Sequence, residues 1–482
     1  MKHLVKFSIE HYLSSINKGK VEPSHSRFDE VCQIVKRTLD EEWDRMVSDS
    51  EKATRLDHEK GAIIGKDSDV MFFKDKISQI LASKKLLSEG YPTYYPSLTE
   101  GIFASLYGLD CIAPWAYDWT EEFKASSSAK ILGDRVYFLI NGNMVLQPFR
   151  ISKKRRQQLR QALLLAHPQE RTEKGYNEVF LENGTRVTMF SDKFCKDEED
   201  TIVFRKYVLK DLSFEILAGY GTFPKEAIPL FEAMIEIGFN VVFVGQMRSG
   251  KTTFLQTWMH YMDQSLEGVA LATDPETHWK SILPDAPLME LVADKEELEK
   301  ISKPIRRSDA DYIILEEMRD ASAYNMFTDI ISLGTMHSAG TIHDRNPLNV
   351  PKKMADSICN EYGGDRDSII ASLYENVNYV FELYQVPENK SRKRLKSITE
   401  FRYDPAADKV SAHKICLYDA KSDSWKWRYD IGADKENLAM GYESALARFK
   451  ETLKTLELAN PLKDGMVIYP AYYIGNRRGK EE

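Results

Sequence analysis

Short apolar runs alternate with helix-like patterns through the second half of the chain. Residues 241–244 form a β-branched apolar run, which is typical of a strand buried on both faces, and similar runs occur at 269–272 and 312–315. Apolar residues at helical spacing follow the first and the last of these runs. Because strands that alternate with helices indicate a parallel sheet, we predict an α/β domain over residues 226–385.

The chain before this domain has two other patterns. Two helical apolar patterns, one after Ser26 and one over 72–87, predict a helical N-terminal extension over residues 1–90. The polar stretch 49–61 between them is expected to be a loop or an exposed helix end. Residues 91–225 predict a small α+β domain. Its expected hairpins turn at Asn141-Gly142 and at Asn183-Gly184.

Past the α/β domain, alternating strand-like segments predict an antiparallel meander, closed by a helix over about 440–458. Residues 386–482 are therefore expected to form a small β-rich region with a C-terminal helix.

Composition narrows the class of protein. The 482 residues carry a net charge of −8, which argues against a surface built to bind nucleic acid, and the basic cluster Lys153–Arg156 is interpreted as a solvated helix face. There is no run of 18 apolar residues, so no membrane span is expected, and the N-terminus lacks a signal-peptide pattern. The five cysteines are scattered without zinc-site spacing, which fits a reducing cytoplasm.

The strongest motif follows the run at 241–244. The segment GQMRSGKTT, residues 245–253, gives the strand, GxxxxGKS/T and helix order of a phosphate-binding loop. Backbone N–H groups of such a loop surround a phosphate, the lysine reaches the β- and γ-phosphates, and the hydroxyl holds Mg²⁺. The predicted nucleotide-binding residues are Gly245, Arg248, Ser249, Gly250, Lys251, Thr252 and Thr253. Arg248 either adds charge beside the phosphates or points to solvent.

Further polar residues follow the other strands at their carboxyl ends, where ligands of open α/β sheets bind. Glu317 fits the water-polarising role, and His343 the role of a group that senses the γ-phosphate. Asp274 and Glu276 are candidates for the metal shell or a second water contact, with Thr252 and Asp274 as the expected metal-site residues. The alternatives are a capped helix start with local ion pairs for Glu316/Glu317 and Arg319/Asp320, and a structural histidine at 343.

Taken together, these segments resemble the type II and type IV secretion ATPases, in particular the CpaF/TadA-like branch related to PilT and GspE. The resemblance covers about residues 95–385 and rests on segments in the family's order. These are GQMRSGKTT, TDPETH, IRRSDADYIILEEMRD and GTIH, with NGTRV and TIVFRKY before them.

The resemblance implies a role for each matching residue. Glu317 becomes the Walker B glutamate, His343 the His-box histidine, and Asp274 with Glu276 the acidic box. It also implies catalytic roles for Arg307, Arg186 and Arg205, which are arginines that meet developing charge. The chain departs from the family's pattern at Arg248, Thr273, Glu316 and Thr335, where the family has glycine, glutamate, glycine and histidine, respectively.

The family's properties give the expected function. The resemblance implies a RecA-like P-loop NTPase core with an α+β N-terminal domain, assembled as a ring, with a hexamer as the expected form. It implies hydrolysis of ATP with Mg²⁺ between the two domains, powering pilus assembly, protein secretion or conjugative transfer. The expected location is cytoplasmic, attached to the inner face of the membrane through a platform protein. The alternatives are a nucleotide-binding structural subunit with little turnover, motivated by the departures, and a DNA-transfer motor, motivated by Lys153–Arg156.

Overall fold

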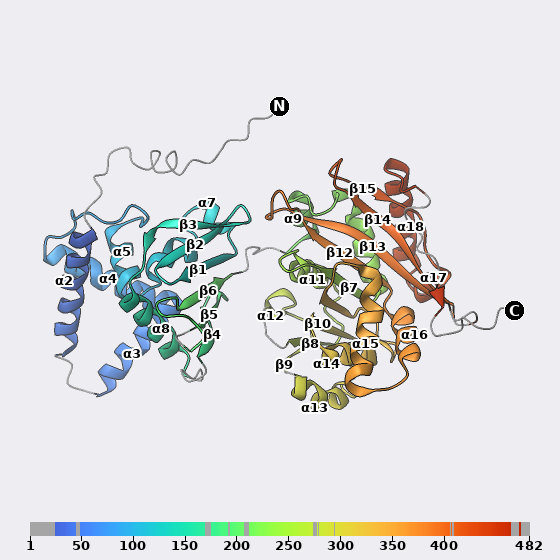
Figure 1. Ribbon diagram of the computed structural model, residues 1–482, viewed down its shortest axis with the longest axis horizontal. Helices are drawn as coiled ribbons and strands as arrows, with labels where there is room; N and C mark the ends of the chain where they lie inside the picture. The colour runs from blue at the N-terminus through green and yellow to red at the C-terminus, as the bar shows by residue number, and fades with distance from the viewer. Residues whose placement is uncertain are drawn as a thin grey trace. The chain divides into compact units, whose positions relative to one another are not determined.

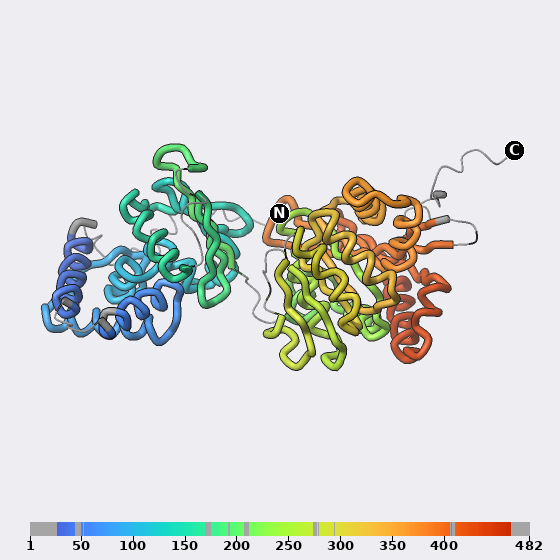
Figure 2. The backbone as a smooth tube through the Cα atoms, turned by 90° about the horizontal axis from the view of Figure 1, so that it is seen from below, coloured from blue at the N-terminus to red at the C-terminus, as the bar shows by residue number. Residues whose placement is uncertain are grey.

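The computed structural model describes residues 25–44, 49–168, 175–190, 193–206, 212–272, 277, 279–293, 295–404, 406, 409–463 and 472–473. The chain folds as two compact units, Met1–Val208 and Leu209–Glu482. Figure 1 labels their elements, and Figure 2 traces the backbone from below, after a turn of 90° about the horizontal axis. Each unit has its own core and sheet.

The first unit begins with helices. Its longer helices are α2 (His25–Asp44), α3 (Asp49–Ile64), α4 (Asp67–Ser83) and α5 (Leu98–Leu106). Short helices follow at η1 (Asp110–Ile112), α6 (Ala113–Ala116) and α7 (Glu121–Lys124). The loop alternative for 49–61 was wrong, because this stretch is helical and forms most of α3. The buried Ala62 and Ile63 anchor the end of α3, and His58 pairs with Asp69 of α4 at 2.7 Å.

A six-stranded antiparallel sheet completes the first unit, in the order β3-β2-β1-β6-β5-β4. Its strands are β1 (Ser128–Leu132), β2 (Arg135–Ile140), β3 (Asn143–Arg150), β4 (Tyr176–Phe180), β5 (Arg186–Phe190) and β6 (Thr201–Arg205), with helix α8 (Lys153–Ala166) between β3 and β4. Both predicted hairpins are confirmed, since β2 pairs with β3 and β4 pairs with β5. At the first turn Asn141 and Gly142 both have positive φ, at 49° and 79°, as a two-residue hairpin loop requires.

The second unit is built on one ten-stranded sheet. Its path runs β15-β14-β13-β12-β7-β11-β10-β8-β9, and β16 pairs with β14. The strands are β7 (Val241–Gly245), β8 (Gly268–Ala272), β9 (Leu288–Val292), β10 (Tyr312–Met318), β11 (Ala339–His343), β12 (Tyr379–Gln385), β13 (Lys393–Asp404), β14 (Lys409–Asp419), β15 (Ser424–Trp427) and β16 (Tyr472–Tyr473). Pairing is parallel from β12 to β9 and antiparallel from β12 to β15, so the predicted meander continues the parallel sheet.

Helices cover both faces of this sheet. They are α9 (Phe214–Gly219), η3 (Lys225–Ala227), α10 (Ile228–Ile237), α11 (Lys251–His260), α12 (Trp279–Ile282), α13 (Lys295–Ile305), α14 (Ala321–Ile331), η4 (Pro347–Asn349), α15 (Val350–Tyr362), α16 (Arg366–Asn376), α17 (Ala433–Leu438) and α18 (Glu443–Ala459). Phe243 packs with α10, α11 and α18, whereas its neighbours Val242 and Val244 pack with α13 to α16. The prediction that β7 is buried on both faces is therefore confirmed.

The helix expected near 440–458 is observed as α18. Among the helices of the described ranges, none is both long and apolar enough to cross a bilayer.

Candidate functional site

Three neighbouring strands bring the predicted site residues to one edge of the sheet. β7, β11 and β10 are parallel neighbours, so their carboxyl ends lie side by side. His343 lies directly opposite Gly245 in the β7–β11 register, and Glu317 lies near the end of β10. The edge where ligands of open α/β sheets bind thus holds the phosphate loop, a histidine and a carboxylate.

The loop 245–252 has the backbone conformation that its glycines suggest. Gly250 has φ 93° and is the N-cap of α11, so the first N–H groups of that helix are available at the loop. A Cβ at Gly245 would lie 2.4 Å from the carbonyl oxygen of Leu383 and from Ser249 Oγ, so only glycine fits there. Arg248 has φ 63°, a left-handed conformation that costs a non-glycine residue about 1 kcal/mol. The loop keeps this bend although arginine occupies the position.

The interior of the loop fits a phosphate. The hydroxyl of Ser249 is buried and has no hydrogen-bond partner among the described residues. A buried hydroxyl in this state is costly unless a ligand oxygen bonds to it. No group of three or more His, Cys, Asp or Glu within the described ranges forms a metal site. The Thr252 hydroxyl is the group that would hold a magnesium ion together with phosphate oxygens and water, the usual pattern for Mg²⁺ at phosphates.

Lys251 joins the loop to the strand ends. Its side chain is 6% exposed, and its Nζ donates to the carbonyl oxygen of Gln246 at 3.1 Å. The same Nζ lies 3.1 Å from His343 Nδ1. An ammonium group has no acceptor, so Nδ1 accepts this hydrogen bond and the proton of a neutral His343 resides on Nε2.

Glu317 completes this chain of contacts. His343 Nε2 lies 2.7 Å from Glu317 Oε1, and Arg319 Nη2 donates to Glu317 Oε2 at 2.6 Å. Burial by itself raises the pKa of Glu317, but the hydrogen bonds from His343 and Arg319 outweigh it and lower the pKa to about 2. Glu317 is therefore a carboxylate at neutral pH.

The preceding residue, Glu316, faces the other way. Its carboxylate is buried and accepts from Trp279 Nε1 at 2.7 Å and from Thr277 Oγ1 at 3.1 Å. Gln256 of α11 donates to the same Thr277 hydroxyl at 2.9 Å. Glu316 thus ties β10 to the start of α12, whereas its neighbour Glu317 contacts His343 and Arg319.

The remaining predicted site residues are Asp274, Glu276, Arg307, Arg186 and Arg205. Asp274 and Glu276, with Thr273, lie outside the described residues. Arg307 is exposed in the turn before β10, at the opposite end of that strand from Glu317. Arg186 and Arg205 belong to the first unit, where they face each other across β5 and β6, and Arg186 pairs with Glu178 at 3.2 Å.

The helix-start alternative for residues 316–320 is confirmed in part, since Asp320 caps α14 and Arg319 forms an ion pair with Glu317. One contributor to this edge was missed from the sequence. Lys393, at the start of β13, packs against Gly250. The spacing of residues gives no signal for Lys393, because only the strand order brings it to the loop.

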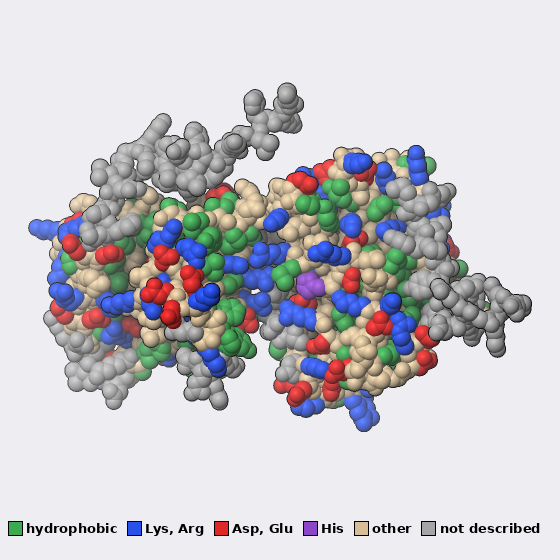
Figure 3. Space-filling model, in the orientation of Figure 1, with side chains coloured by type: hydrophobic (Ala, Val, Ile, Leu, Met, Phe, Trp, Pro, Cys, Tyr) green, Lys and Arg blue, Asp and Glu red, His purple; other side chains and the backbone are tan. Residues whose placement is uncertain are grey.

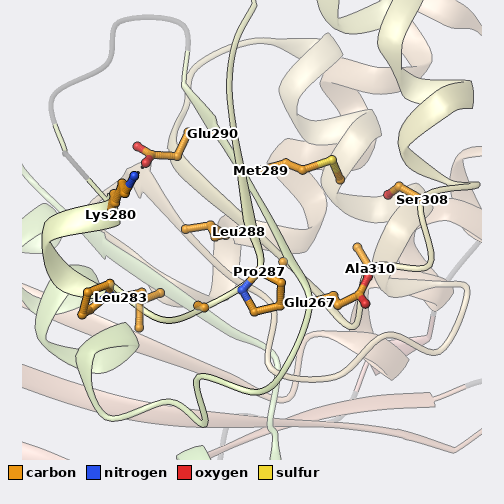
Figure 4. Close-up of a pocket in the computed structure, with 12 residues that line it drawn as sticks. Glu267, Lys280, Leu283, Pro287, Leu288, Met289, Glu290, Ser308 and Ala310 are labelled. Carbon is orange, nitrogen blue, oxygen red and sulfur yellow. Dashed lines mark hydrogen bonds between the residues drawn. The ribbon is translucent and has the colours of Figure 1, made fainter.

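A cavity of about 510 Å³ lies elsewhere. It is lined by Gly268, Leu288, Met289 and Ala310, among others (Figure 4). These residues lie at the amino ends of β8 and β9 and just before β10, so this cavity is at the opposite edge of the sheet from Lys251. Over the face of the second unit in Figure 3, basic and acidic side chains are interspersed.

Sequence comparison finds only distant, uncharacterised relatives. No protein-family model matches the chain. Two proteins of Methanocaldococcus jannaschii are 22% identical, one over 44% of this chain and 77% of its own length, the other over 50% and 43%. A protein of Bacillus anthracis is 23% identical over 38% of this chain and 41% of its own length. The chain thus spans less than half the length of two of these three relatives.

Structural comparison finds secretion and pilus ATPases. The chain is similar to the VirB11 ATPase of the Brucella suis type IV secretion system in complex with sulphate, at 16% identity and a TM-score of 0.32, over 61% of this chain and 94% of that one. It is similar to the Legionella pneumophila ATPase DotB at 15% identity and a TM-score of 0.46, over 73% and 93%. It is also similar to the pilus retraction motor PilT with bound ADP, at 13% identity and a TM-score of 0.43, over 70% and 91%.

Proposed function

We propose that this chain is a P-loop ATPase with a RecA-like core, which hydrolyses ATP with Mg²⁺. The observation that carries the proposal is the chain of contacts from Lys251 Nζ through His343 to Glu317, at the carboxyl ends of three adjacent parallel strands beside the loop. A lysine for phosphates and a carboxylate for water are the parts that phosphoryl transfer to water requires.

Each residue has a role that follows from its position. The N–H groups at the start of α11 bind phosphate oxygens, and Lys251 exchanges its contact with His343 for the β- and γ-phosphates. Glu317, an ionised acceptor, orients the attacking water, and His343 lies between it and the lysine. The Thr252 hydroxyl would hold a magnesium ion, which would supply positive charge to offset that of the phosphates. Asp274 and Glu276 in the metal shell, and Arg307, Arg186 and Arg205 as partners of the transition-state charge, are proposed on the sequence resemblance alone.

The test measures binding and turnover separately. Lys251→Ala is expected to lose both nucleotide binding and phosphate release. Glu317→Gln keeps the shape of the side chain and is expected to bind ATP normally. Its rate of ATP hydrolysis is expected to fall by a factor of about a hundred or more. Lys396→Gln is the control, because this lysine lies on β13 and pairs with Glu382 at 2.6 Å. Normal turnover in Lys251→Ala would remove the proposal.

At the level of the assembly, we propose a ring motor, with a hexamer as the expected form. It would act in the cytoplasm on an inner-membrane platform protein and drive secretion or pilus assembly. Light scattering of the purified protein with and without Mg–ATP tests the ring, and a single mass equal to the monomer under both conditions contradicts it. A structural subunit with little turnover remains the alternative, and phosphate release no faster than in Glu317→Gln would favour it.

The DNA-transfer alternative loses support from the basic cluster at the start of α8. Arg155 donates to Asp110 at 2.6 Å, and the buried Arg156 donates to Asp200 at 2.7 Å. Lys153 lies 3.9 Å from Glu198. These contacts hold α8 to its own unit, so nucleic acid is not a proposed partner.

A further inference from the structure

Lys393, the first residue of β13, stands beside the phosphate loop. β12 pairs with β7 so that Leu383 lies opposite Gly245, and Lys393 lies opposite Gln385 of β12. Gln385 is two residues farther along β12 than Leu383, in the direction in which β7 runs into its loop. The strand register therefore places Lys393 just beyond the carboxyl end of β7, level with the loop.

The side chain of Lys393 extends from the face of the sheet that α11 covers. Leu395, which shares a face with Lys393, belongs to the same core as Phe243 of β7 and Phe254 of α11. A Cβ added to Gly250, the N-cap of α11, would lie 3.5 Å from Lys393 Cγ and 3.8 Å from Lys393 Cβ. The aliphatic part of Lys393 thus packs on the start of the helix whose free N–H groups bind phosphate.

Among the described residues, Lys393 lacks the carboxylate partner that the neighbouring cations of β13 have. Arg394 donates to Asp423 at 3.0 Å and Lys396 to Glu382 at 2.6 Å, whereas Lys393 Nζ donates to the carbonyl oxygen of Lys390 at 2.5 Å. Within the described part of the chain, no ion pair joins Lys393 to a carboxylate. Burial and the Arg248 guanidinium lower the pKa of Lys393 to about 8. The ammonium group therefore stands in a site that favours an added anion.

We propose that Lys393 is a phosphate-contacting residue of the nucleotide site and acts beside Lys251 and Arg248 on the phosphates of a nucleoside triphosphate. The inference rests on the proposed function and extends it, because the β12–β13 hairpin of the antiparallel part then takes part in binding. A half-buried cation at a helix N-terminus, beside another cation, is electrostatically unfavourable. A bound polyphosphate stabilises it, because negative charge then lies next to it.

The first measurement is the affinity for Mg–AMP-PNP by titration calorimetry. Lys393→Gln is expected to weaken binding by about ten- to a hundredfold, the range for loss of one hydrogen bond to a charged group. Lys393→Arg keeps the charge and is expected to stay within about threefold of the wild type. Lys396→Gln, on the opposite face of β13, is the matched control and is expected to leave the affinity unchanged.

The second measurement is proton uptake on binding at pH 8. About half of the Lys393 side chains are then neutral in the free protein, and a phosphate raises their pKa, so binding takes up roughly half a proton. Titrations in buffers of different ionisation enthalpy measure this uptake. The groups shown to act on Lys393 are the Arg248 guanidinium and the Lys390 carbonyl, and neither titrates near pH 8; Gln385, opposite Lys393 on β12, is also uncharged. Both Lys393→Gln and Lys393→Arg are expected to abolish the uptake.

The outcomes separate this inference from the proposed function. If Lys251→Ala abolishes binding while Lys393→Gln keeps wild-type affinity and proton uptake, Lys393 merely covers the start of α11, and the inference is wrong. If Lys251→Ala binds normally, the proposed nucleotide site itself is wrong. A folded Lys393→Arg variant with wild-type affinity and no proton uptake at pH 8 supports the inference even if Lys393→Gln is unstable.

Discussion

The parallel and antiparallel halves of the ten-stranded sheet use charge in opposite ways. In the parallel half, β7 and β8 are wholly buried, and the charged residues of the site stand at the carboxyl ends. In the antiparallel half, charged groups lie within the strands themselves, as Glu400 and Arg402 of β13 and His413 of β14 show. The two halves share β12, so the contrast arises within a single sheet.

The buried charges of the antiparallel half satisfy one another. Glu400 is fully buried and accepts from Tyr379 Oη at 2.8 Å, Arg402 Nε at 2.5 Å and the N–H of Gly432 at 2.9 Å. Arg402 also donates to Asp430, which lies 2.9 Å from His413 Nδ1. The charges at the parallel edge instead converge on a loop with a buried, unpartnered hydroxyl. We call the charges around Glu400, which bond to one another, the closed network, and the charges at the parallel edge the open network. The closed network stabilises the fold, whereas the open network is suited to a ligand.

The largest effect should come from opening the closed network. Glu400→Ala leaves Arg402, the Tyr379 hydroxyl and the Gly432 N–H without their acceptor, and should lower the free energy of unfolding by about 3–5 kcal/mol. Urea unfolding of the full chain measures this change. The exposed Glu375→Ala on α16 is the control and should stay within about 0.5 kcal/mol of the wild type. A loss below about 1 kcal/mol for Glu400→Ala would show that the network is not closed as described.

A smaller effect is expected at the open edge, and it depends on pH. The pKa of Glu317 is lowered to about 2, so its contacts stabilise the fold above the ordinary carboxyl pKa and are lost as pH falls toward 2. The wild type should exceed Glu317→Gln in unfolding free energy by on the order of 1–2 kcal/mol at pH 7, after allowance for solvent screening. Urea titrations at pH 7 and pH 3 should show this difference shrinking; a constant difference contradicts the assignment.

The smallest effect concerns the backbone of the loop. Arg248 has φ 63°, and glycine adopts this conformation without steric cost. Arg248→Gly should therefore raise the free energy of unfolding by about 0.5–1 kcal/mol. The exposed Arg345→Gly, at a residue without positive φ, should instead lower it slightly, because glycine adds entropy to the unfolded chain. Thermal unfolding compares the two variants, and destabilisation of Arg248→Gly would mean that the arginine side chain holds the loop.

Local patterns predicted much of the second unit. The strand at 241–244, the loop after it and the strand ends carrying Glu317 and His343 follow from hydrophobic runs and glycine spacing, because these signals are contiguous in sequence. Hydrophobic spacing did not predict the helix at 49–61. This stretch is polar, and the buried residues that anchor the helix, Ala62 and Ile63, come after it.

The contacts of the site were harder to predict. The bond between Lys251 and His343, and the position of Lys393 beside Gly250, depend on which strands neighbour β7. Strand order is a property of the whole chain, and the spacing of individual residues does not predict it.

The central position of β7 has a further consequence. β7 is hydrogen-bonded on both sides, to β11 and β12, and helices cover it above and below. Amides in such a strand exchange with solvent only when the whole unit opens, whereas β9 and β15 at the margins open first. The phosphate loop is therefore anchored to the part of the sheet that melts last, so fraying at either margin leaves its geometry intact.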